Sequence, residues 1–142
     1  MDKYKDVIIN TCFSFFFIIM LVFFRFNLIK TFTDKFLGFL AIICSSIVLF
    51  AKTNFLLDIG HFIYTAPYML GVTFLSYNKY LLLLNVVMLF NIIFSRYYYD
   101  ECILNDKQNN TGFFTDISDY LNINWDYVYL ILFFVSLVRT VE

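Results

Sequence analysis

Charged residues divide the chain into five apolar runs separated by short polar stretches. A helix of about 20 predominantly apolar residues is long enough to cross the hydrocarbon core of a bilayer. Four of the runs approach that length, and the last is shorter. The pattern predicts an all-α, polytopic integral membrane protein in which residues 1–142 form a single membrane domain, with transmembrane helices at about 7–24, 36–51, 59–78, 80–95 and 125–139.

Whether there are four or five transmembrane helices depends on the last run, whose uninterrupted apolar part covers only residues 127–138. It crosses the membrane only if Trp125 and the flanking polar residues lie at the level of the headgroups. In the third run we expect Pro67 to kink the helix, which membrane helices tolerate. The tight turn at residues 76–79 predicts that the third and fourth runs pack as an antiparallel hairpin.

Residues 96–124 form the one substantial segment predicted to lie outside the membrane, and acidic residues are frequent in it. Thr111 suits the N-cap of a helix. The apolar residues that follow it recur at helical spacing: Phe113, Phe114, Ile117, Tyr120 and Leu121. We therefore expect one short amphipathic helix that lies at the membrane interface or against a partner.

Composition supports the membrane assignment, because 61% of the residues are hydrophobic and only 15% are charged, against about 25% charged in soluble domains. The net charge of −1 argues against nucleic acid as a partner. Lysine and arginine divide equally between the two sides of a five-span topology, so the positive-inside rule gives no orientation. The three cysteines lack the spacing of a zinc site or a disulfide framework.

His61 is the only histidine and lies one helical turn after Asp58, on the same face of the third run. An ionisable side chain inside a membrane is a functional candidate because its burial is costly. His61 could ligate a haem, relay a proton or bond a quinone carbonyl, and a bis-histidine haem would take its second ligand from another chain. Alternatively, His61 lies near the membrane surface and hydrogen-bonds Asp58 or a backbone carbonyl.

The other polar residues of the apolar runs favour packing over chemistry. Asn85 and Asn91 in the fourth run are expected to hydrogen-bond between helices, and Gly38, Ala41 and Ser45 form a small-residue patch that allows close helix approach. The sequence contains no metal-spaced cluster and no pair of nucleophile and base. We therefore expect neither a catalytic residue nor a metal site.

Two short stretches resemble respiratory-chain membrane subunits. Residues 81–92, LLLLNVVMLFNI, are similar to the third-helix signature of subunit 6 of the proton-pumping NADH dehydrogenase, without the glycine that precedes it there. Gly112, Asp119 and Tyr120 resemble a motif of the small succinate dehydrogenase anchor. That resemblance implies a quinone role for Tyr120, but Gln108 stands where the family has a haem-ligating histidine.

Further likenesses concern the source of the chain. Its residues 61–71, 102–105 and 112–113 resemble an uncharacterised family of small bacterial membrane proteins without an assigned function. Its 20 phenylalanines, set against four glycines and one proline, favour A/T-rich codons. Such a bias is similar to that of proteins encoded in protist mitochondrial genomes, and a large A/T-rich DNA virus gives a similar ratio.

Together these observations predict a small accessory subunit of a respiratory-chain complex in the mitochondrial inner membrane, whose partners are other membrane subunits and lipids. It would carry no cofactor of its own. One alternative is an anchor subunit in which His61 contributes to a haem or quinone site at a subunit interface. Another is a stand-alone viral or endomembrane protein, for which glycosylation at the Asn109 sequon would be evidence.

Overall fold

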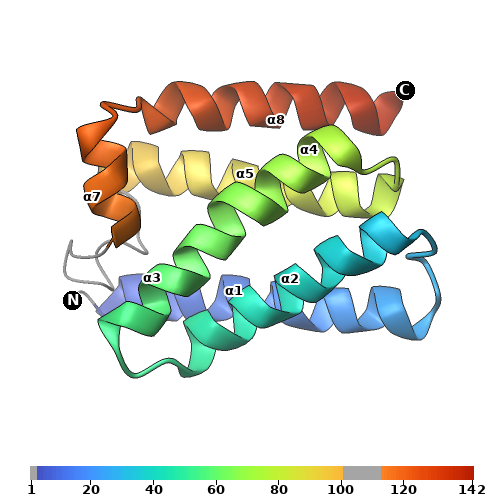
Figure 1. Ribbon diagram of the computed structural model, residues 1–142, viewed down its shortest axis with the longest axis horizontal. Helices are drawn as coiled ribbons and strands as arrows, with labels where there is room; N and C mark the ends of the chain where they lie inside the picture. The colour runs from blue at the N-terminus through green and yellow to red at the C-terminus, as the bar shows by residue number, and fades with distance from the viewer. Residues whose placement is uncertain (1–2, 101–112) are drawn as a thin grey trace.

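The computed structural model describes residues 3–100 and 113–142, and the side chains of the second stretch from Asp116 onward. The described chain is helical and contains no strand. It runs back and forth along one bundle (Figure 1). The first two passes are α1 (Lys3–Arg25) and α2 (Phe32–Phe50). The third pass is continuous but consists of three parts, namely α3 (Asn54–Ile63), the π-helix η1 (Tyr64–Leu70) and α4 (Gly71–Leu75). The last two passes are α5 (Lys79–Tyr99) and α8 (Trp125–Val141), and the short α7 (Phe113–Tyr120) precedes α8.

Polar caps decide where several of these helices begin, because the first turn of a helix leaves backbone N–H groups without partners. The Thr31 hydroxyl accepts a hydrogen bond from the Asp34 N–H at 3.2 Å and starts α2. Thr53 and Asn124 cap α3 and α8 in the same way, and Asn78 caps α5. The caps follow directly from residue type, since Thr and Asn side chains are favoured at this position.

Within residues 3–100 and 113–142, three helices are long and apolar enough to cross a membrane, namely α1, α2 and α5. This is fewer than the four or five spans that the sequence predicts. The third pass is apolar but divided by η1, and α8 has only 17 residues. The helix boundaries also differ from the expected spans, since the third pass begins at Asn54 instead of residue 59.

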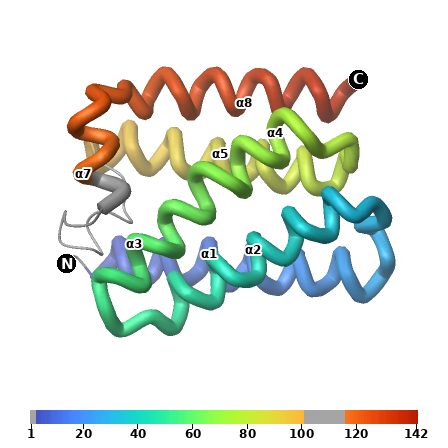
Figure 2. Tube along the Cα trace, viewed as in Figure 1, coloured from blue at the N-terminus to red at the C-terminus, as the bar shows by residue number. Residues whose placement is uncertain are grey.

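The passes pack in an order that differs from the expected hairpin of the third and fourth runs. The third pass crosses the bundle diagonally between the pair α1–α2 and the pair α5–α8, as Figure 2 shows. Its backbone approaches α5 most extensively near the turn, through α4, whereas α3 packs mainly on α2 and α5 packs most extensively on α8. The hairpin prediction was wrong beyond the turn itself, because a tight loop fixes the ends of two helices but not their crossing angle.

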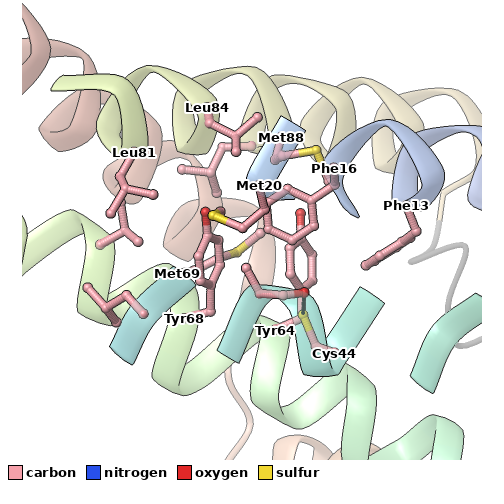
Figure 3. Packing of buried hydrophobic residues seen from close by; sticks show 14 of the residues in the cluster. Phe13, Phe16, Met20, Cys44, Tyr64, Tyr68, Met69, Leu81, Leu84 and Met88 are labelled. Carbon is pink, nitrogen blue, oxygen red and sulfur yellow. Dashed lines mark hydrogen bonds between the residues drawn. The ribbon is translucent and has the colours of Figure 1, made fainter. Parts of the chain in front are cut away.

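Aromatic rings form the centre of the bundle (Figure 3). Phe16 of α1 packs edge-on against Tyr64 and Tyr68 of η1, with ring centroids 5.7 and 5.1 Å apart. The two tyrosine rings are stacked at 6.1 Å, and Phe13 adds a further edge-on contact to Tyr64 at 5.1 Å. Such edge-to-face pairs contribute about 0.5–1.5 kcal/mol beyond burial. They join the first pass of the chain to the third.

Small residues let the helices approach α2 closely. Gly38, in the patch expected from the sequence, lies against the Phe24 ring of α1, where an added Cβ would come within 2.8 Å of Cε2. Ala41 and Ser45 of the same patch are fully buried. On α3, Gly60 lies against Ile47, and a Cβ there would come within 2.8 Å of Cγ2. The predicted close approach is therefore confirmed, and the sequence did not indicate the second contact.

Candidate functional site

His61 lies on α3 and is almost fully buried, with 3% of its surface exposed, and Asp58 one turn earlier is 6% exposed. His61 lines a cavity of about 60 Å³. We call this the His61 cavity. It is bounded by α1, by α3 and η1, by α5 and by α8, so it lies where four of the five passes meet.

The lining of the His61 cavity combines an apolar wall with a few polar groups. Ile8, Ile9, Phe13 and Met88 supply apolar surface. The polar groups come from different passes of the chain: His61, Tyr64, Thr65, Asn91, Ser95, Arg96 and Tyr129. An apolar pocket with a few convergent polar groups is the usual form of a small-molecule site. The cavity therefore becomes the candidate site of this molecule.

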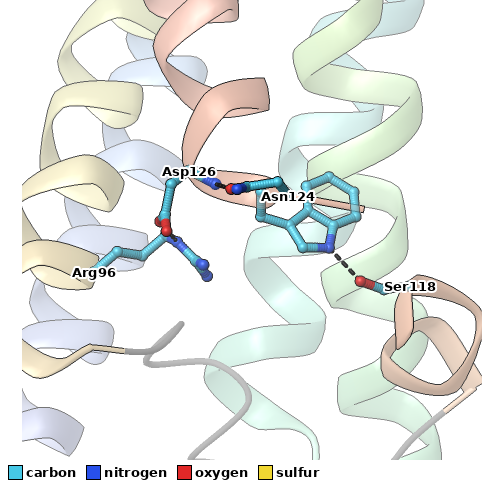
Figure 4. Close-up of polar contacts among 5 residues, drawn as sticks. Arg96, Ser118, Asn124 and Asp126 are labelled. Carbon is cyan, nitrogen blue, oxygen red and sulfur yellow. Dashed lines mark hydrogen bonds and ion pairs between the residues drawn. The ribbon is translucent and has the colours of Figure 1, made fainter. Parts of the chain in front are cut away.

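Arg96 stands at the boundary between the His61 cavity and a second hollow of about 330 Å³, since it lines both. Its Nε donates to Asp126 Oδ1 at 2.6 Å (Figure 4). Its guanidinium carbon lies 5.6 Å from the centroid of the Tyr129 ring. The Arg96 side chain is 18% exposed and that of Asp126 is 67% exposed. The ion pair therefore joins the end of α5 to the start of α8 at the surface of the bundle.

The helix changes to π geometry at the cavity wall. Tyr64 and Thr65 belong to η1, which follows α3 without interruption and contains Pro67. The expected kink at Pro67 is thus a seven-residue π-helix in the structure. Proline lacks the N–H that a regular α-helix would use there, and π turns occur frequently at functional sites. The hydroxyls of Tyr64 and Tyr68 are buried and have no hydrogen-bond partner among the described residues.

Asn85 is the centre of a buried polar cluster between α4, α5 and α8. Its Nδ2 donates to Thr73 Oγ1 of α4 and to Ser136 Oγ of α8, both at 3.0 Å, and those two hydroxyls lie 3.0 Å apart. All three residues are fully buried. The prediction that Asn85 hydrogen-bonds between helices is confirmed. Asn91 instead donates to the Val87 carbonyl of its own helix at 3.0 Å, so that part of the prediction was wrong.

The expected amphipathic helix corresponds to α7, and its contact with a membrane interface or a partner stays a prediction. Ser118 is buried and accepts a hydrogen bond from Trp125 Nε1 (Figure 4). Ile117, Tyr120 and Leu121 are exposed. Tyr120, with 89% of its surface exposed, does not line the His61 cavity. The predicted N-cap at Thr111, the sequon at Asn109, and Gly112 and Gln108 of the anchor motif lie outside the described residues.

Sequence reasoning identified His61 but not Arg96, Asp126 or Tyr129, which come from segments far from it along the chain. The one sequence feature that could have pointed to these residues is the position of Arg96 at the end of an apolar run. Among the described residues, no group of three or more His, Cys, Asp or Glu side chains could hold a metal ion. Comparisons of the chain with protein-family models, curated proteins and solved structures gave no match.

Proposed function

We propose that this chain is a small integral-membrane accessory subunit that crosses the bilayer five times and acts by packing against neighbouring helices and lipid. Besides the three helices that are long enough by themselves, the proposal counts the third pass and α8 as membrane spans. The third pass is continuous from Asn54 to Leu75 across η1. The 17 residues of α8 rise about 26 Å, which is at the short end of the range for spanning helices.

The observation that supports a packing role is the large amount of exposed apolar surface along the passes. A soluble monomer rarely exposes extended apolar patches, and such patches mark contact with membranes or with proteins. The exposed side chains on α1, α5 and α8 run along most of each helix: Val7, Phe15, Ile18, Leu21 and Val22; Leu83, Val87, Phe90 and Phe94; Leu130, Ile131, Phe134, Leu137 and Val138. These faces would be covered by lipid chains and by partner helices.

The more specific form of the proposal places the subunit in a respiratory-chain complex of the mitochondrial inner membrane. Its support is the resemblance of residues 81–92 to a NADH dehydrogenase subunit and the A/T-biased composition. The acidic segment from residue 96 to 126 would contact a neighbouring subunit. Within that segment, the exposed Ile117 and Tyr120 of α7 and the exposed Leu121 just after it offer an apolar surface for such a contact.

Native gel electrophoresis of gently solubilised membranes tests this proposal. We expect the chain to migrate at high mass together with respiratory subunits identified by mass spectrometry, and to shift to low mass after a dissociating detergent. Migration at low mass under the gentle condition would overturn the subunit proposal. Comigration with a different set of membrane proteins would keep the packing role and reject the respiratory assignment.

The His61 cavity favours a second candidate, a subunit that contributes to a haem or quinone site. The small volume of the cavity argues against such a site within this chain alone. The cavity volume of about 60 Å³ is less than half of the roughly 150 Å³ that accommodates a benzene molecule. His61 is also the only histidine of the chain. Neither haem nor a quinone ring fits the cavity with its lining side chains in place, so this function requires a partner subunit to open or complete the site.

Spectra of the isolated complex distinguish the two candidates. Loss of a b-type haem spectrum or of quinone binding in His61→Ala, but not in Asn91→Ala, would favour the second. Asn91 lines the same cavity, and its amide bonds only its own helix, so it controls for cavity enlargement. Identical spectra in wild type and His61→Ala would remove the second candidate.

A further inference from the structure

We propose that one end of the bundle binds the headgroups of anionic phospholipids. This end, here called the basic end, comprises loops 26–31 and 76–78, the adjoining helix ends and the C-terminus of α8. Figure 2 shows both loops and the C-terminus together, opposite α7. The proposal rests on membrane insertion of the chain, but it needs no partner subunit and no cofactor.

Charge distinguishes the two ends of the bundle. The basic end carries five cations, Arg25, Lys30, Lys35, Lys79 and Arg139, against two acids, Asp34 and Glu142. The described part of the opposite end carries four cations, Lys3, Lys5, Lys52 and Arg96, against six acids, Asp6, Asp58, Asp100, Asp116, Asp119 and Asp126. Among the described residues, the two ends thus carry similar numbers of cations, and the position of the acids leaves a positive excess at the basic end alone.

The fold keeps Asp34 away from the surface of the basic end. Asp34 is 4% exposed. Its two carboxylate oxygens accept hydrogen bonds from the Ser76 and Thr31 hydroxyls at 2.6 and 2.7 Å. Asn78 Nδ2 donates to the Leu28 carbonyl at 2.7 Å and ties the two loops together. The Asp34 carboxylate is therefore engaged in hydrogen bonds that hold the loops, whereas Lys30, Lys35 and Lys79 are exposed on the surface around it.

Exposed aromatic rings place the basic end at the depth of the headgroups. Phe26, Phe32 and Tyr77 are 70, 85 and 87% exposed. The Arg139 guanidinium lies 5.1 Å from the centroid of the Tyr77 ring and donates to the Thr73 carbonyl. Tyrosine and tryptophan side chains gather at membrane–water interfaces, which concerns Tyr77 here, and lysines within a Debye length of anionic headgroups are attracted to them. A lysine beside an anionic surface strengthens binding about fivefold.

Quenching of tryptophan fluorescence by brominated lipids tests the proposal at each end separately. Trp125 is the only tryptophan and lies at the opposite end, at the start of α8. The double variant Trp125→Phe, Tyr77→Trp moves the reporter to the basic end. Both proteins are reconstituted in phosphatidylcholine mixed with phosphatidylglycerol, with either lipid brominated in turn. We expect brominated phosphatidylglycerol to quench more strongly than brominated phosphatidylcholine only when the indole is introduced by Tyr77→Trp.

Charge removal supplies the matched control. In the Tyr77→Trp background, Lys30→Gln, Lys35→Gln and Lys79→Gln together should abolish the several-fold preference for phosphatidylglycerol, and high salt should reduce it. The same three substitutions at Lys3, Lys5 and Lys52 should leave it intact. Equal quenching by both lipids, or equal loss in both triple variants, would overturn the proposal. Absence of quenching by either lipid would instead reject membrane insertion, and circular dichroism verifies that each variant is folded.

Discussion

At the scale of single residues, the buried amide of Asn85 contributes little net stability to the fold. Its Nδ2 bonds Thr73 and Ser136, but its Oδ1 is buried with no partner among the described residues. An interhelical hydrogen bond in a membrane contributes on the order of 0.6 kcal/mol, and an unsatisfied buried oxygen opposes that gain. The two effects nearly cancel.

We therefore predict that Asn85→Leu changes the free energy of unfolding in detergent by less than about 1 kcal/mol, because Thr73 and Ser136 still bond each other. Asn85→Ala should cost more, since it leaves a cavity. Denaturation by increasing SDS measures both. If Asn85→Leu proved the more destabilising variant, the amide would have a role that its contacts do not explain.

The glycines of the α2 interface differ in how easily their neighbours can move. A Cβ on Gly60 would meet Ile47 at Cγ2 and Cβ, 2.8 and 3.2 Å away, and a Cβ atom moves only with its backbone. A Cβ on Gly38 would meet the tip of the Phe24 ring. We predict that Gly60→Ala destabilises by about 1–3 kcal/mol. Gly38→Ala should be near neutral, because the higher helix propensity of alanine offsets the contact.

Thermal unfolding in detergent ranks the two glycine variants. A Gly38→Ala protein less stable than Gly60→Ala would show that the ring of Phe24, and not the backbone of α2, limits the packing. Far-UV circular dichroism of both variants should match the wild type, since neither substitution shortens a helix.

At the scale of helices, a side-chain hydrogen bond joins α7 to α8. Trp125 Nε1 donates to Ser118, a buried residue of α7. We predict that Ser118→Ala speeds amide hydrogen exchange in α7, leaves α8 protected, and changes the emission of Trp125, because loss of such a bond costs about 1 kcal/mol. Ser46→Ala is the control, since Ser46 bonds only the Ile42 carbonyl of its own helix. Equal exchange in wild type and Ser118→Ala would mean that packing on α3 holds α7 instead.

Helix existence followed from sequence far better than helix geometry did. The apolar runs predicted where α2 and α3 lie but not where they begin, since the expected starts at residues 36 and 59 are Phe32 and Asn54 in the structure, after caps at Thr31 and Thr53. The π-helix could not, because a proline in an apolar run fits a kink equally well. The packing partner of each helix face could not be predicted from the sequence either, since periodicity shows that a face is buried but not which helix covers it. Arg96 and Asp126 are 30 positions apart and meet only because α5 packs on α8.

At the scale of the whole molecule, the direction of the passes makes the five-span proposal testable one pass at a time. Loops 26–31 and 76–78 and the C-terminus would lie on one side of the membrane, and residues near Lys3, Lys52 and Asp119 on the other. In a background with Cys12, Cys44 and Cys102 replaced by serine, single cysteines are introduced as Lys3→Cys, Lys52→Cys, Tyr77→Cys, Asp119→Cys and Glu142→Cys. An impermeant maleimide then labels oriented vesicles from one side.

We expect the cysteines at positions 77 and 142 to react from one side, and those at positions 3, 52 and 119 only from the other or after detergent is added. The pairs 52/77, 77/119 and 119/142 each bracket one pass, and the pair 3/52 brackets α1 and α2 together. If the third pass failed to span, positions 52 and 77 would react from the same side. If α8 failed to span, positions 119 and 142 would react from the same side, and the span count would fall to four. The short α8 is the more sensitive of the two passes, because a bilayer thicker than about 26 Å requires local thinning around it.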